Sequence, residues 1–377
     1  MSISQELYIR LNETIRPLVG VSNSKQVSNW LWIVVGLMQG NSPALSKLAT
    51  YLPMDTNAES RVTLIRRWLK NLKVDVWAFY QPILAQALQG WQAMEVLVIL
   101  DGVMVFGDRW QVFRLALQHG HRAIPLAWVV VEGTGVTSVE RLTEMLTRVA
   151  KFLRRRVKCV TFLADRGFRD RDWAELCRKL HWNYGIRITC NTYVTLANDR
   201  SCRVDELGVP RGQRRYFQNV RLTQEAKLRT NLSVGWTEGD DQAEPELLAV
   251  ISNQVACRMR LQEYGHRMSI EQSFRDDKSG GFDMAHTRLQ HADRIERLLL
   301  AMAIATLWCH ELGEQVLAGG ETTRREIDPG LTRELSLFQL GLRWLKRCLA
   351  TAIHHLPVFQ ARLSNLKLAP VAVSTAS

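Results

Sequence analysis

The chain has 377 residues and a formal net charge of +12, from 49 lysines and arginines against 37 aspartates and glutamates. Hydrophobic residues make up 46% and charged residues 23%, which excludes a mainly disordered or fibrous protein. The length predicts about two or three globular domains. The positive charge favours a polyanionic partner such as nucleic acid.

Neither membrane insertion nor secretion is expected. The longest apolar stretches, residues 94–106 and 298–308, are too short to cross a bilayer, and Asp101 interrupts the first. The N-terminus lacks the basic and apolar regions of a secretory signal, and the seven cysteines form no C-x-x-C pair. We therefore expect a cytoplasmic protein with reduced thiols and no membrane partner.

Residues 1–90 are predicted to form a helical domain. An apolar-rich stretch spans residues 27–37, and the Asn-Ser-Pro run at residues 41–43 favours a helix start. Two short helices at residues 44–51 and 60–72, joined by a turn-rich segment, are typical of a helix-turn-helix.

The second of these short helices is basic. It carries Arg61, Arg66 and Arg67, which we expect to contact DNA. A small helical bundle with a solvated basic face has the same pattern, so both interpretations stay open. The favoured one is a DNA-binding domain.

From Glu95 the pattern changes to β-strands. An apolar run beginning at Val96 ends at Asp101, and strand-like stretches follow at residues 110–117 and 124–131. Three antiparallel strands, then helix, strand, helix and strand, are the order of a ribonuclease-H-like α/β core. The later elements are predicted at residues 138–155, 157–164, 170–180 and 182–189.

The core is predicted to span residues 91–312 and to contain an insertion. Short polar strands and turns between about residues 191 and 246 predict a β insertion, and a further apolar strand follows at residues 247–252. The chain then has helical character from residue 257 to about 312, with a break at Gly280-Gly281. Residues 313–377 are predicted to form a C-terminal helical region with a frayed tail.

Four residues late in the core share one helix face. Tyr264, Arg267, Glu271 and Lys278 are spaced so that, at about 100° per residue, they fall within one narrow stripe. A carboxylate flanked by a phenol, a guanidinium and an ammonium suits a divalent ion beside a phosphodiester. An exposed helix with spaced ion pairs has the same pattern.

Three acids are the candidate metal ligands. Asp101 and Asp165 each follow an apolar strand, so in a sheet of the predicted order they lie side by side, with Glu271 delivered by the late helix. Three adjacent carboxylates need a neutralising cation, and their hard oxygens favour Mg²⁺ or Mn²⁺. A pair of such ions suits in-line phosphoryl transfer.

These residues resemble a known family. The Asp101 strand, the Asp165-Arg166-Gly167-Phe168 run and the Tyr264-(2)-Arg267-(3)-Glu271-(6)-Lys278 spacing are similar to bacterial insertion-sequence transposases of the DDE class with the Y-R-E-K signature. The resemblance covers about residues 90–312. It implies cut-and-paste transposition with Mg²⁺ or Mn²⁺, in which the three acids hold the metal while the Tyr, Arg and Lys contact the DNA backbone.

The resemblance also implies partners. They are double-stranded DNA, comprising the terminal inverted repeats of an element and a target, and a second copy of the chain in a synaptic homodimer at the bacterial nucleoid. Some family members stack a flipped base on an aromatic residue of the β insertion, and Trp236 is the candidate here. A core or surface tryptophan is the alternative.

Other acids compete for two of the three positions. Asp108 follows a glycine in an apparent turn, so we expect it to be solvated and assign the first acid to Asp101. Asp276 and Asp277 lie near Glu271, but their helical angles place them away from the stripe. Glu271 therefore remains the third acid.

Two other functions fit part of the pattern. A metal-dependent nuclease or resolvase on the same core would cleave DNA without joining a 3′ end to a target. A DNA-binding regulator descended from a transposase would bind DNA only. The intact acids argue against the regulator.

Overall fold

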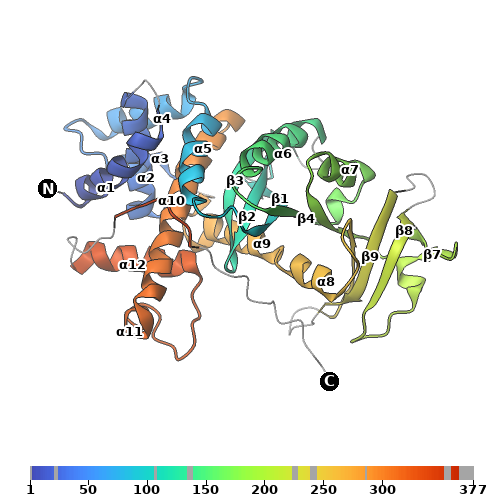
Figure 1. The fold of residues 1–377 in the computed structure, drawn as a ribbon. Helices are drawn as coiled ribbons and strands as arrows, with labels where there is room; N and C mark the ends of the chain where they lie inside the picture. The colour runs from blue at the N-terminus through green and yellow to red at the C-terminus, as the bar shows by residue number, and fades with distance from the viewer. Residues whose placement is uncertain are drawn as a thin grey trace.

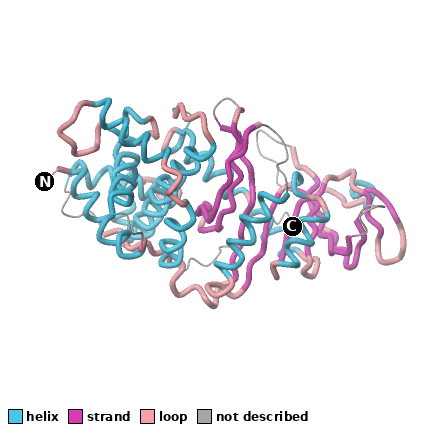
Figure 2. Tube along the Cα trace, turned by 90° about the horizontal axis from the view of Figure 1, so that it is seen from above, coloured by secondary structure: helices cyan, strands magenta, loops and turns pink. Residues whose placement is uncertain are grey.

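The computed structural model describes residues 2–20, 24–105, 108–133, 139–222, 228–237, 244–284, 287–351 and 358–364. Helices gather at one end of the molecule, and a large sheet fills the middle and the other end (Figures 1 and 2). The tail predicted at the C-terminus lies outside the described residues. None of the described helices combines the length and apolarity needed to span a membrane.

The N-terminal part of the chain is helical. Three helix starts are fixed by side chains, because Ser2, Asn57 and Asp75 each accept a hydrogen bond from a backbone N–H three residues further on. The predicted pair of short helices is present as α3 and α4. The helices are α1 (Ile3–Leu18), α2 (Ser24–Gly40), α3 (Leu45–Ala49), α4 (Ala58–Lys70) and α5 (Val76–Ala87).

One sheet contains the described strands in the order β3-β2-β1-β4-β5-β10-β9-β8-β6-β7. The first three strands of the chain pair antiparallel, whereas β4 runs parallel to β1 and β5 parallel to β4. This order and these directions confirm the predicted ribonuclease-H-like α/β core. The core strands are β1 (Glu95–Val105), β2 (Trp110–His119), β3 (Arg122–Glu132), β4 (Cys159–Ala164) and β5 (Asn183–Ile188).

Helices cover both faces of the core sheet (Figure 1). Side chains of β1 alternate between the faces, as the period of a strand requires. Val98 and Leu100 join the main apolar core, whereas Leu97 and Ile99 pack in a separate cluster with Ile270 of α9. The first face is covered by α6 (Val139–Leu153) and α7 (Arg171–Lys179), and the second by α8 (Arg258–Gly265) and α9 (Met268–Arg275).

The β insertion extends the core sheet sideways. β10 (Leu247–Ser252) pairs antiparallel with β5 on one side and with β9 on the other, so the insertion continues the same hydrogen-bonded sheet. Strand directions change at the edge of β5, where the parallel core ends. The elements of the insertion itself are β6 (Tyr193–Thr195), β7 (Ser201–Arg203), the 3₁₀ turn η2 (Val204–Leu207), β8 (Arg215–Leu222) and β9 (Leu228–Trp236).

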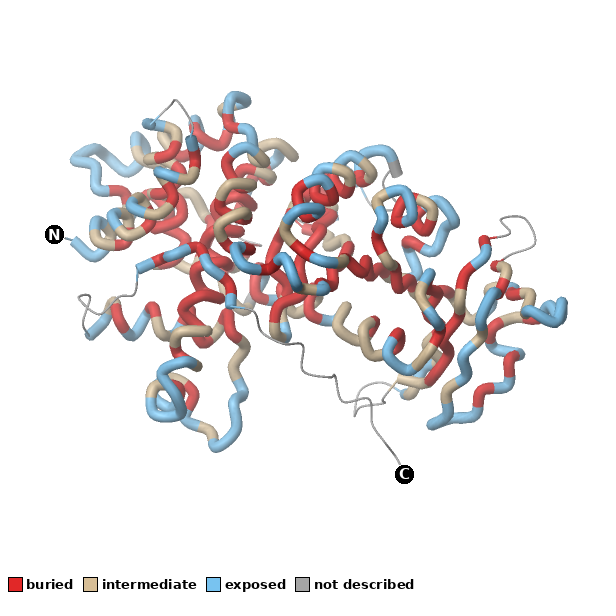
Figure 3. The backbone as a smooth tube through the Cα atoms, viewed as in Figure 1, coloured by how far each residue is buried: buried red, intermediate tan, exposed pale blue. Residues whose placement is uncertain are grey.

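The helix α10 (Ala292–Ala318) connects the helical end of the molecule to the sheet. It is buried over most of its length (Figure 3) and packs against α2, α4 and α5, against β3, and against α12 (Leu337–Thr351). The short helix α11 (Gly320–Arg325) follows it. The C-terminal region is only partly helical, since residues 358–364 form no helix.

The helical stretch predicted from residue 257 to about 312 is present with its predicted break at Gly280-Gly281, and it has a further break after Gly265 that was not predicted. The chain there forms α8, α9, the π-helical turn η3 (Asp276–Gly280) and then α10. Between α8 and α9, His266 and Arg267 keep right-handed helical backbone angles. The break between α8 and α9 therefore changes the directions in which their side chains point only slightly.

Two glycines allow α10 and α12 to cross at backbone contact. A Cβ atom on Gly341 would lie 1.8 Å from the carbonyl oxygen of Cys309, and one on Gly313 would lie 2.1 Å from that of Leu337. Neither obstacle is a flexible side chain, so any larger residue must push the helices apart. The crossing consequently depends on both glycines.

We expect Gly341→Ala to lower the free energy of unfolding by about 2 kcal/mol or more, because the added methyl overpacks a backbone contact. Gly20→Ala is the matched control, since a Cβ there meets nothing within 4 Å. Urea unfolding of both variants measures the difference. Equal stability of the two variants would contradict the crossing described.

The segment at residues 358–364 ties the C-terminal region to α10. Glu311 of α10 accepts hydrogen bonds from the backbone N–H groups of Gln360 at 2.8 Å and Arg362 at 3.4 Å. Burial raises the pKa of Glu311 to about 7, opposed by these hydrogen bonds and reinforced by Glu314. The carboxyl group is therefore harder to ionise in the folded chain than in the unfolded chain.

This shift makes stability depend on pH. The pKa of Glu311 is about 7 in the folded chain and about 4.5 in an unfolded chain, so between these pH values the folded state holds a proton that the unfolded state has lost. The contribution of Glu311 to stability therefore falls as pH rises through that window. We expect the wild type to lose about 2–3 kcal/mol relative to Glu311→Gln between pH 5 and pH 8. Urea unfolding at both pH values tests this, and parallel pH profiles would refute it.

Candidate active site

Asp101 and Asp165 are neighbours because of the register between two parallel strands. Leu100 of β1 is the partner of Ala164 of β4, so each aspartate follows one member of a pair. Paired strands lie about 4.8 Å apart, which places the two residues side by side. The prediction that Asp101 ends its strand is wrong, since β1 continues to Val105 beside β2 alone.

Both aspartates point to the α9 face of the sheet. Residues two apart on a strand share a face, so Asp101 follows Ile99 and Asp165 follows Leu163. Both of these apolar residues pack in the cluster that includes Ile270 of α9. Asp165 leaves the strand as the cap of the 3₁₀ turn η1 (Arg166–Phe168), and its Oδ1 accepts the N–H of Gly167 at 2.8 Å.

Glu271 is brought to the same face by the packing of α9. Ile270 and Phe274 bury their side chains against the sheet. Ser273 fixes the helix to β3, because its Oγ accepts the N–H of Ala123 at 2.8 Å and donates to the carbonyl of Ala123 at 3.1 Å. With these residues turned inward, the half-exposed Glu271 faces the edge where the two aspartates lie.

Arg267 links two of the three acids. Its guanidinium donates to Asp101 Oδ2 at 3.0 Å and to Glu271 Oε1. The Arg267 side chain is 13% exposed, Asp101 is 15% exposed and Glu271 is 40% exposed. A single cation therefore neutralises carboxylates from β1 and α9 in a partly desolvated place.

The acids influence one another electrostatically. Burial raises the pKa of Asp101 to about 6; Arg267 and the Gly102 N–H lower it, and Asp165 and Glu271 raise it further. Asp165 thus follows the strand beside Asp101, and Arg267 links Asp101 to Glu271, while the role of the three acids as one metal-binding set remains a prediction.

The donor chemistry suits a divalent cation. Three carboxylates supply the hard oxygen ligands that Mg²⁺ and Mn²⁺ prefer. With Arg267 between Asp101 and Glu271, however, the described residues contain no group of three or more His, Cys, Asp or Glu side chains gathered closely enough to hold one metal ion. A metal bound by both acids would have to take the place of the guanidinium.

A sequence comparison identifies the family of the chain. A family model described as "Transposase DDE domain" matches residues 107–308, which is more than half of the chain. The chain belongs to the transposase DDE domain family. The match contains Asp165 and Glu271 and begins after Asp101. The chain is therefore a DNA transposase, an enzyme that cleaves DNA and transfers strands, and members of this family depend on divalent metal ions.

A comparison with curated proteins finds no match. Among solved structures, the cryo-EM structure of a piggyBac transposase synaptic complex with hairpin DNA resembles the chain with a TM-score of 0.46 and 9% sequence identity. That similarity covers 99% of this chain and 87% of the other.

The other residues of the predicted stripe lie on three successive segments of the transposase. Tyr264 of α8 is buried, with its ring beside Leu261 and the Arg267 guanidinium 6.0 Å from the ring centroid. Its hydroxyl has no hydrogen-bond partner among the described residues, and burial raises its pKa to about 12. Lys278 is exposed on η3. Their contacts with DNA remain predictions.

The predicted DNA-binding residues outside the core have different surroundings. Trp236 ends β9, half-buried, with its Nε1 donating to the Val209 carbonyl at 3.0 Å, so its indole is fixed in the insertion. Arg61 donates to two carbonyls of the turn before α4 and stabilises that turn. Arg66 pairs with Glu59 at 3.4 Å, and both it and Arg67 are exposed.

Two buried ion pairs were not predicted. Asp277 pairs with Arg114 of β2 at 2.5 Å, and Asp276 pairs with Arg122 of β3 at 2.6 Å. They attach the turn η3 to the sheet and explain why these acids do not join the candidate site. An arginine within the apolar run of β2 was the available sequence signal, because a buried guanidinium needs a carboxylate partner.

We expect Asp277→Asn to destabilise the transposase by about 3–5 kcal/mol, because it leaves the Arg114 guanidinium buried without its counter-charge. Arg114 is only 3% exposed. The exposed Asp55→Asn serves as the control, and thermal or urea unfolding is the measurement. A variant of normal stability that fails only in DNA cleavage would instead assign Asp277 to the chemistry.

Proposed function

We propose that this transposase cuts the ends of a bacterial insertion sequence and joins them to target DNA by a cut-and-paste route, with Asp101, Asp165 and Glu271 holding Mg²⁺ or Mn²⁺. The observation that supports the proposal is that Arg267 links Asp101 of β1 to Glu271 of α9, while Asp165 follows the strand β4 paired with β1. Bound divalent ions supply activation of a water or 3′-hydroxyl and stabilise the leaving oxygen.

Arg267 is the proposed backbone ligand nearest the reacting phosphate. Its guanidinium already meets two carboxylate oxygens, and the same planar donor fork fits two phosphate oxygens. The ring of Tyr264 supports it from the sheet side. In this arrangement Arg267 exchanges carboxylates for phosphate when DNA and metal are bound.

The remaining roles are proposed on charge and position. Residues 1–90 form a DNA-binding domain in which Arg66 and Arg67 contact duplex DNA, while Arg61 supports the turn before them. Lys278, which lies on η3, contacts the DNA backbone. The β insertion at about 191–246 presents Trp236 to an unstacked base, and residues 313–377 complete a homodimer that synapses two ends in the cytoplasm.

Two variants test the acids. We expect Asp101→Asn and Glu271→Gln to reduce Mg²⁺-dependent cleavage of element-end DNA by at least about 100-fold, because each removes one charge from the metal-holding set. DNA affinity should change little. The assay is strand cleavage and transfer by the purified chain, with a chelator control.

Asp108→Asn is the matched control, because Asp108 is an exposed aspartate beyond the end of β1. It should cleave like the wild type. Cleavage without joining of a 3′ end would support the nuclease instead, and tight DNA binding without metal-dependent cleavage would support the regulator. Full activity of Glu271→Gln would reject the assignment of the third acid.

A further inference from the structure

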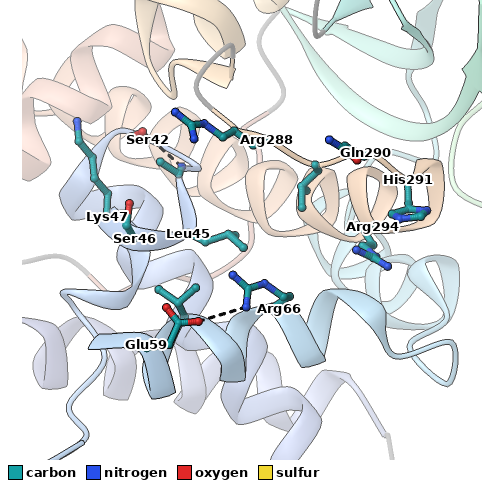
Figure 4. A pocket seen from close by; sticks show the side chains of 13 residues that line it. Ser42, Leu45, Ser46, Lys47, Glu59, Arg66, Arg288, Gln290, His291 and Arg294 are labelled. Atoms are coloured by element: carbon teal, nitrogen blue, oxygen red, sulfur yellow. Dashed lines mark hydrogen bonds and ion pairs between the residues drawn. The ribbon is translucent and has the colours of Figure 1, made fainter. Parts of the chain in front are cut away.

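A basic cavity lies between the N-terminal helices and the segment that leads into α10. It has a volume of about 780 Å³ and is lined by α3 and α4 on one side and by residues 288–291 and Arg294 on the other (Figure 4). The two walls are far apart in the sequence. They are brought together because α10 packs against α4.

The cavity carries a concentrated positive charge. Lys47, Arg66, Arg288 and Arg294 line it, and Glu59 is the acid among the lining residues. Glu59 pairs with Arg66 at 3.4 Å (Figure 4). Elsewhere many arginines pair with carboxylates, as in the two buried pairs that attach η3 to the sheet.

Three of these cations are left without a counter-charge. Within the described part of the chain, the side chains of Lys47, Arg288 and Arg294 take part in no hydrogen bond or ion pair. Like charges gathered around one cavity repel one another, so an anion that enters gains attraction from several cations at once. The arrangement favours a ligand with more than one negative charge.

The cavity also offers apolar contacts and backbone donors. Leu45, Val62 and Leu289 form part of its lining. The long helix α10 begins there, and its cap residue His291 provides no side-chain hydrogen bond to the first turn. The uncapped N–H groups and positive end of the helix dipole therefore add to the attraction for an anion.

We propose that this cavity binds the phosphodiester backbone of duplex DNA and that Lys47, Arg288 and Arg294 are its principal phosphate ligands. The inference rests on the proposed function for the identity of the nucleic acid. A sugar-phosphate chain has regularly spaced anions separated by less polar sugars, which matches cations beside an apolar wall. One tract of DNA then contacts α3 and α4 together with the segment that follows η3.

Contacts of this kind position DNA without reading its sequence. Each phosphate neutralised contributes about 0.9 to the slope of log affinity against log salt concentration. Removal of two ligands should therefore lower the slope by about 2 and weaken binding at moderate salt by about 10-fold or more. The loss should be equal for element-end DNA and for an unrelated duplex.

The test compares two double variants of the full chain. Arg288→Gln/Arg294→Gln removes two cavity cations, and Arg343→Gln/Lys346→Gln removes two exposed cations from α12 outside the cavity. Each variant lowers the net charge by two. Fluorescence anisotropy with both duplexes across a salt series gives affinity and slope, and thermal unfolding checks that the two variants fold equally well.

A smaller slope and weaker binding in the cavity variant, with the α12 variant like the wild type, is the expected result. Equal losses in both variants, or no loss in the cavity variant, would overturn the proposal. Calorimetry with inorganic phosphate and a mononucleotide provides a second arm. In one outcome the cavity variant loses saturable binding of inorganic phosphate or of the mononucleotide while its duplex binding is unchanged. That result would assign the cavity to a small phosphate ligand and would also overturn the proposal.

Mg²⁺-dependent cleavage by the wild type separates this inference from the proposed function. Duplex binding through the cavity without cleavage leaves the inference standing and rejects the enzymatic proposal for this chain. Cleavage by the wild type, together with full duplex binding by the cavity variant, supports the enzymatic proposal and rejects the inference about the cavity. No binding of either duplex by the wild type overturns both.

Discussion

The parallel pairing of β1 with β4 is the constraint on which the candidate site depends. In its register Asp101 and Asp165 each come directly after a residue of one strand pair. Because side chains alternate along a strand, both aspartates lie on the face of the sheet that α9 covers. A shift of one residue in either strand would turn one aspartate into the opposite core. The apolar packing of Ile270 and Phe274 then determines where the third carboxylate lies.

Arginines balance the acids on this face in two different ways. Arg114 and Arg122 form buried pairs with Asp277 and Asp276 and attach the end of α9 to β2 and β3. Arg267 instead meets two acids that are partly open to solvent. The first kind of contact stabilises a fixed geometry, since breaking a buried pair leaves an uncompensated charge. The contacts of Arg267 can be exchanged for others, because water reaches both of its carboxylate partners.

The core strands could be predicted from local features, because apolar runs define them, and Asp101 and Asp165 are visible as the carboxylates that follow two of these runs. Glu271 is selected by its helical spacing from Tyr264 and Arg267. The break between α8 and α9 could not be predicted, because sequence periodicity reports only the directions of side chains. His266 and Arg267 keep helical backbone angles, so these directions hardly change across the break. The continuation of β1 beyond Asp101 depends on pairing with β2, which is a tertiary property. The basic cavity combines Lys47 with Arg288, and such a juxtaposition has no local signal.

The insertion belongs to the same sheet as the core, and this has a mechanical consequence. From β4 the sheet passes through β5 and β10 to β9, each strand hydrogen-bonded to the next. Three strand spacings amount to about 14 Å, so the strand that carries Trp236 stands at a set lateral distance from the acids. Because each strand on this path is hydrogen-bonded to the next, the sheet itself fixes the lateral position of the insertion relative to the core.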